Sequence, residues 1–131
     1  MNPAFIVIDD NSINNTICRI TIQRTIPESD IQTFLIPEEG FAYISTQYLT
    51  IDNPTILFLD INMPRWSGWD FLDHFEKLDK KIKEQIEIHM LTSSINANDK
   101  KRAADHKNVD GFIEKPLTKE ILQKMLGNTN T

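Results

Sequence analysis

The 131-residue sequence contains a single cysteine, Cys18, and no apolar run that approaches the ~20 residues needed to span a bilayer. One cysteine cannot form an internal disulfide and has no second cysteine with which to share a metal. Because Cys18 sits among apolar residues, we expect it to pack in the core. The N-terminus lacks the basic region and cleavage site of a signal peptide, so the sequence favours a cytoplasmic protein.

Basic residues are also in deficit, since 14 Lys and Arg stand against 19 Asp and Glu and give a formal net charge of −5. This balance argues against direct binding to nucleic acid or to a membrane, because both favour a basic protein surface. The chain has no internal repeat, no low-complexity tract and no linker rich in Pro, Gly or Ser. Its length suits one domain over residues 1–131, which can bury a core without a disulfide or a structural metal.

Short apolar runs alternate with segments of helical spacing along the chain. The runs at 4–8, 55–59 and 86–91 are β-branched or aromatic and apolar on both faces, as buried parallel strands are. Weaker runs lie at 30–35 and 111–113. Strands that alternate with helices predict a parallel sheet with helices on both faces.

The helical segments are expected near 13–26, 37–48, 71–78 and 118–125, where apolar side chains recur three and four residues apart. Residues 96–107 are nearly all polar and could form either an exposed helix or a loop. The predicted order is therefore five strands, each followed by one helix.

Charged and hydroxyl side chains follow the predicted strands. Asp9 and Asp10 come after the first strand, Asp60 ends the third, Thr92 follows the fourth and Lys115 follows the fifth. In a parallel α/β sheet, ligand sites lie at the carboxyl ends of the strands. We therefore expect these side chains to meet at one edge of the sheet.

Three carboxylates that share one site repel one another, and without a counter-charge at least one of them has a raised pKa. A set of oxygen ligands suits Mg²⁺, and Lys115 offers a second positive charge. Mg²⁺, an ammonium group and the Thr92 hydroxyl together suit a phosphoryl group, and a carboxylate that faces them can be the nucleophile. The pattern predicts phosphoryl transfer to an aspartate.

The sequence resembles the receiver domain of two-component response regulators, the CheY-like family, over about residues 3–127. The resemblance rests on five separated elements in order: "IDDN", "FLDINMP", Gly68, "LTSS" and "EKP". It implies a flavodoxin-like, doubly wound (βα)5 fold with a five-stranded parallel sheet in the order 2-1-3-4-5.

The resemblance also implies a metal site. Asp10 corresponds to the direct Mg²⁺ ligand of the acidic pair, and Asp9 to its partner, which often acts through water. Asp60 and the main-chain carbonyl of Asn62 complete the expected ligand set. The implied cofactor is therefore Mg²⁺.

Asp60 resembles the phosphoacceptor of the family, and Lys115 resembles the lysine that pairs with it. Thr92 corresponds to the hydroxyl that reports phosphorylation. Phe112 stands at the position of the switch aromatic residue, where Tyr is common. The resemblance thus implies a switch that runs from Asp60 through Thr92 to Phe112.

The function that follows is a signalling switch and not an enzyme. A sensor histidine kinase or a phosphotransfer protein would donate a phosphoryl group from its phosphohistidine to Asp60. The surface over about residues 96–126 would then change its affinity for a downstream protein, which the sequence does not identify.

Other functions fit the residues less well. An Mg²⁺-dependent phosphohydrolase would want a second carboxylate two residues after the nucleophile, where this chain has Asn62. A flavin-binding module would want a hydroxyl- and glycine-rich loop after the first strand. A degenerate receiver that acts as a constitutive protein-binding module is the remaining alternative. Trp66 and Trp69 could serve as partner contacts, core packing or a loop lid.

Overall fold

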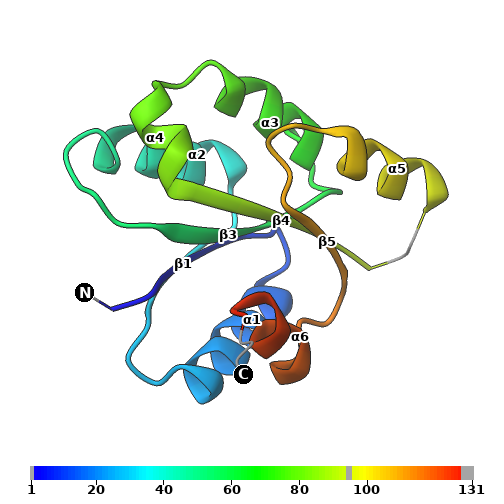
Figure 1. Cartoon of the computed structure of the whole chain (residues 1–131). Coiled ribbons are helices and arrows are strands. Elements are labelled where there is room, and N and C mark those ends of the chain that lie inside the picture. Colours follow the sequence, from blue (N-terminus) through cyan, green and yellow to red (C-terminus); the bar gives the residue numbers. More distant parts are fainter. Residues whose placement is uncertain (1, 94–95, 128–131) are drawn as a thin grey trace.

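The computed structural model describes residues 2–93 and 96–127 and contains one five-stranded parallel sheet in the order β2-β1-β3-β4-β5 (Figure 1). This order confirms the flavodoxin-like topology. The strands are β1 (Ala4–Ile8), β2 (Asp30–Phe34), β3 (Thr55–Asp60), β4 (Ile86–Thr92) and β5 (Gly111–Glu114).

Helices cover both faces of the sheet, as expected for buried parallel strands. In Figure 1, α1 and α6 lie on one face, and the other four helices lie on the opposite face. The helices are α1 (Ser12–Thr25), α2 (Pro37–Gln47), α3 (Gly68–Glu76), α4 (Lys80–Gln85), α5 (Ala97–Asp105) and α6 (Lys119–Met125).

The sheet separates two apolar cores. On one side, alternate strand residues pack against side chains of α2 to α5, including Ile44, Phe71, Phe75, Ile82 and Ala103. On the other side, the strands pack against Cys18 and Ile22 of α1 and Leu122 of α6. Cys18 is 3% exposed, which confirms that it packs in the core. Because helices cover both faces of the sheet, polar side chains from several strands can gather only at the ends of the strands.

One helix was not predicted. The predicted order of five strands, each followed by one helix, did not include α4, which lies between α3 and β4. Its six residues contribute a single buried side chain, Ile82, so no apolar periodicity could be detected in the sequence. The Asp79 carboxylate caps it by accepting a hydrogen bond from the Lys81 amide.

The polar segment 96–107 does contain a helix, α5, in which only Ala103 is buried. The expected fourth and fifth helices are therefore α5 and α6. Thr118 caps α6, as its position before the apolar residues suggested. In the described part of the chain, no helix combines the length and the apolar character that crossing a membrane requires.

Candidate functional site

The three predicted carboxylates meet at the carboxyl edge of the sheet. Asp9, Asp10 and Asp60 each offer a carboxylate oxygen, and these oxygens lie within 4.8 Å of one another. They line a pocket of about 280 Å³ together with Asn11, Asn14, Asn62, Ser93 and Lys115. The strand ends therefore place the predicted metal ligands and the predicted lysine around one space.

Lys115 connects the two buried carboxylates. Its Nζ lies 2.8 Å from Asp9 Oδ2 and 3.1 Å from Asp60 Oδ1, and its side chain is 12% exposed. Asp9 is fully buried and Asp60 is 3% exposed, whereas Asp10 faces solvent. Burial lowers the pKa of Lys115, but hydrogen bonding and charge attraction to Asp9 and Asp60 raise it overall. The ammonium group therefore stays charged between the two carboxylates.

One lysine does not balance three carboxylates. Burial and the neighbouring Asp9 charge raise the pKa of Asp60 from 3.8 to about 7, although Lys115 acts in the opposite direction. The site thus carries excess negative charge among oxygen donors only. That donor set and that charge fit Mg²⁺, with the carboxylates of Asp9, Asp10 and Asp60 as the groups that would hold it, and Asn62 lines the same pocket.

Two asparagines that the sequence interpretation passed over hold Asp9 in place. The Asn11 amide donates to Asp9 Oδ1 at 2.9 Å, and the Asn11 side chain caps α1. Asn15 Nδ2 donates to the main-chain oxygens of Asp9 at 3.0 Å and Phe34 at 3.3 Å. Asn15 lies on the buried stripe of α1 with Cys18 and Ile22, so a polar residue at an apolar position was the available signal.

The chain after Asp60 returns to the same strand end to begin α3. The Gly68 amide donates to the Ile61 carbonyl at 2.7 Å, and Ser67 and Asp70 form a capping box at the start of the helix. A Cβ on Gly68 would lie 2.7 Å from the Asp60 main-chain oxygen. Only glycine allows this close approach between the helix start and the candidate acceptor.

We expect Gly68→Ala to destabilise the protein by about 1–3 kcal/mol, because the clashing atom is main chain and cannot rotate away. Gly40→Ala is the matched comparison, since the nearest atoms to a Cβ there belong to the side chains of Ile8 and Phe34 and not to the main chain. Urea unfolding of both variants measures the difference. An equal loss in the two variants would contradict a special role for the Gly68 contact.

The predicted switch residues lie at the end of β4 and in β5. Thr92 is 1% exposed, and its main-chain oxygen accepts a hydrogen bond from the Lys115 amide at 2.7 Å. Phe112 is half-buried and packs against the core on the α2–α5 side. The Lys115–Pro116 peptide bond is cis. A main-chain hydrogen bond therefore joins Thr92 to Lys115, the residue that pairs with Asp60.

Neither tryptophan lines the acidic pocket. Trp69 is 8% exposed and packs in the core, and the Arg102 Cζ lies 4.3 Å from the centroid of its ring. Trp66 is half-buried and stacks on His74, with ring centroids 4.0 Å apart. Core packing therefore describes Trp69, and Trp66 covers the contact between α2 and α3.

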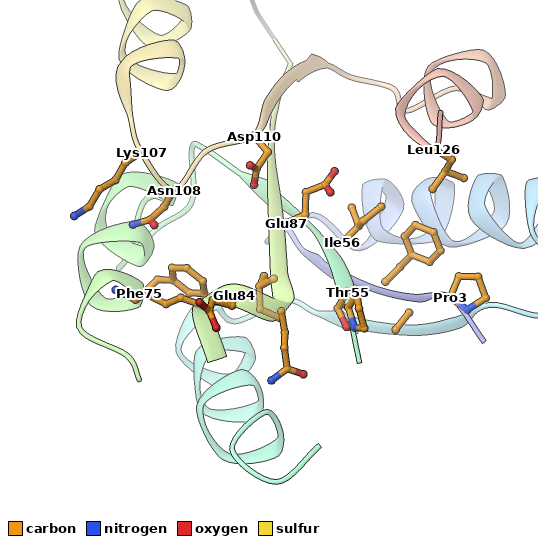
Figure 2. Close-up of a pocket in the computed structure, with 16 residues that line it drawn as sticks. Pro3, Thr55, Ile56, Phe75, Glu84, Glu87, Lys107, Asn108, Asp110 and Leu126 are labelled. Carbon is orange, nitrogen blue, oxygen red and sulfur yellow. The ribbon is translucent and has the colours of Figure 1, made fainter. Parts of the chain in front are cut away.

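A larger hollow of about 560 Å³ lies at the amino edge of the sheet, opposite the carboxylates (Figure 2). Its polar side chains are engaged within the fold. Lys107 and Asn108 both contact the Glu76 carboxylate at 2.6 Å, and Asp110 accepts a hydrogen bond from the Ile88 amide. The hollow therefore lacks convergent unpaired groups, and the acidic pocket is the better candidate site.

Comparison with known proteins agrees with this geometry. Solved structures with the same fold include a two-component response regulator from Cytophaga hutchinsonii, which is 26% identical, with a TM-score of 0.88 and coverage of 97% of this chain and 96% of that one. A response regulator receiver protein from Dyadobacter fermentans is 21% identical, with a TM-score of 0.85 and 95% coverage of both chains. The chemotaxis protein CheY4 of Vibrio cholerae is 22% identical, with a TM-score of 0.75 and 98% coverage of both chains.

No curated protein sequence matches the chain. The profile of the response regulator receiver domain, in contrast, matches residues 5–127, from the second residue of β1 to beyond the end of α6. This match covers nearly the whole sequence and agrees with the strand order and the position of the carboxylates. The chain therefore belongs to the family of response regulator receiver domains.

Proposed function

We propose that this receiver domain accepts a phosphoryl group on Asp60 in an Mg²⁺-dependent reaction and acts as a protein-interaction switch, without turnover of a substrate. The observation that carries the proposal is the buried Asp60 carboxylate, which faces Lys115 and two further carboxylates in one pocket. The donor would be a phosphohistidine on a sensor histidine kinase or a phosphotransfer protein. Family membership supports that class of partner.

In the transfer, an oxygen of Asp60 attacks phosphorus, the N–P bond of the phosphohistidine breaks, and the imidazole leaves with the bonding electrons. Mg²⁺ would supply neutralisation of the charge on the phosphoryl oxygens. Lys115 already lies 3.1 Å from Asp60 Oδ1 and can pair with the new phosphate. Asp9 and Asp10 would hold the metal, together with the Asn62 carbonyl.

The response to phosphorylation would pass through the end of β4. The Thr92 hydroxyl would turn toward the phosphate, and the half-buried Phe112 would repack against the core. The surface formed by α5, β5 and α6 would then change its affinity for a downstream protein. The helix α5 is suited to a change of position, because Ala103 is its only buried side chain.

The test is incubation with acetyl phosphate and Mg²⁺, with and without EDTA, followed by peptide mapping in a mass spectrometer. We expect one phosphoryl group on Asp60 that is absent in EDTA and in Asp60→Asn. Asp73→Asn, which changes an exposed carboxylate of α3, should be labelled like the wild type. No adduct in the wild type would contradict the proposal and favour a constitutive binding module.

A further inference from the structure

The loop after Asp60 contains a residue in a costly backbone conformation. Arg65 has φ of 71°, and it is the one residue other than glycine with a positive φ in the described chain. This left-handed region is unfavourable for a residue with a Cβ and persists only where surrounding contacts hold it. Contacts of Arg65 and its neighbours must therefore hold this conformation.

The first contact joins Arg65 to α2. Arg65 Nε donates to Glu38 Oε2 at 2.8 Å, and Glu38 lies in the first turn of that helix. The other carboxylate oxygen, Glu38 Oε1, is buried and has no hydrogen-bond partner in the described structure. The Arg65 side chain is 71% exposed, and an ion pair at such a site contributes little to stability. The positive φ of Arg65 and the unpaired Glu38 Oε1 are both unfavourable. Stability alone therefore does not explain the contact between these two residues.

The next residue fastens the loop to the same helix and to α3. Trp66 stacks on His74 with an interplanar angle of 8°, and its ring meets Phe41 edge-on at 5.6 Å. Arg65 and Trp66 thus tie one point of the loop to α2 through Glu38 and Phe41. The stack on His74 ties the same point to α3.

The residues between this attachment and Asp60 include Asn62. Asn62 is exposed and lines the acidic pocket, whereas Met63 after it is buried. The segment that carries Asn62 is therefore held by the buried Ile61 and Met63 on either side of it, and then by Arg65 and Trp66.

We propose that Arg65 is a positioning residue: its ion pair with Glu38 holds the loop so that Asn62 is presented to the metal site, which links α2 to Mg²⁺ binding. The inference rests on the proposed function, because it assumes that the acidic pocket takes Mg²⁺. Groups that orient metal ligands set metal affinity although they do not touch the ion.

The test measures the Mg²⁺ dissociation constant of the full chain by calorimetry for Glu38→Gln, Arg65→Gln and the double variant. We expect each single change to raise that constant by about three- to tenfold, and the double variant to be no worse than either, because both changes remove the same ion pair. Glu39→Gln, at the exposed next position in the first turn of α2, is the matched control and should bind like the wild type. Hydrogen exchange in EDTA should show faster exchange at residues 61–67 in the Glu38 and Arg65 variants only.

Arg65→Gly separates positioning from stability. Glycine adopts a φ of 71° without strain, so this variant should be at least as stable as the wild type and yet bind Mg²⁺ more weakly. If Mg²⁺ binding falls only in variants that also lose stability, Arg65 has a structural role and the proposal is overturned. Unchanged binding in Glu38→Gln and Arg65→Gln overturns it too, while leaving the proposed function intact. A wild type that does not bind Mg²⁺ overturns both.

Discussion

Lys115→Met is expected to destabilise the metal-free protein by about 3–5 kcal/mol at neutral to alkaline pH, because it leaves buried carboxylates without their partner. Lys115 Nζ lies within 3.1 Å of oxygens of both Asp9 and Asp60, and neither aspartate is more than 3% exposed. Methionine keeps most of the side-chain volume and removes the charge. Urea unfolding in EDTA measures the loss.

The loss in Lys115→Met should depend on pH and on Mg²⁺. Lys115 opposes the upward shift of the Asp60 pKa, so its removal raises that pKa further above about 7. Below that value Asp60 is protonated and repulsion weakens, so the loss should shrink as the pH falls to about 5. Mg²⁺ should restore part of the stability by replacing the missing charge. Lys119→Met, at an exposed position in α6, is the control and should cost little. A loss of stability that is the same at every pH would point to lost packing instead.

Asp60→Asn should have the opposite effect and stabilise the metal-free protein by about 2–4 kcal/mol at about pH 8. The folded state raises the Asp60 pKa from 3.8 to about 7, so between these values the folded protein binds a proton that the unfolded chain releases. The wild type therefore loses stability as the pH rises through this window, and an amide at position 60 does not titrate. The advantage of Asp60→Asn should be small near pH 4 and complete above about pH 7.

Urea unfolding of the wild type and of Asp60→Asn across this pH range, in EDTA, measures the expected difference in stability. Asp73→Asn serves as the control, because that carboxylate is exposed on α3. Mg²⁺ should narrow the difference, since bound metal would stabilise the folded wild type through the carboxylate that the variant lacks. A variant less stable than the wild type at alkaline pH would mean that Lys115 neutralises Asp60 more fully than the raised pKa indicates.

Lys115→Met and Asp60→Asn should change stability in opposite directions, because the site carries excess negative charge. Removal of one carboxylate relieves repulsion, and removal of the only buried ammonium group found in the described pocket increases it. A site that is unfavourable when empty gains more from a cation. The same arrangement that lowers stability without metal therefore favours the proposed reaction.

Sequence patterns were sufficient to predict the sheet and the edge at which the candidate site lies. The runs at 4–8 and 55–59 are apolar on both faces, and each is followed by carboxylates, so parallel strands necessarily bring Asp9, Asp10 and Asp60 to one edge. Both properties are local, because they depend on residue type within five or six positions. The helix α4 was missed because it is only six residues long and has a single buried side chain, Ile82, so it lacks such a local pattern.

The side-chain contacts across that edge, in contrast, depend on the tertiary structure. Lys115 bridges Asp9 and Asp60 over separations of more than fifty residues, and Glu38 takes its partner Arg65 from 27 residues away. The raised pKa of Asp60 likewise comes from burial and a neighbouring charge, which exist only after the strands have paired. Residue type and spacing predict which groups reach the edge of the sheet. Distances of 3 Å, and the charge balance that follows from them, depend on how the two cores pack against the sheet.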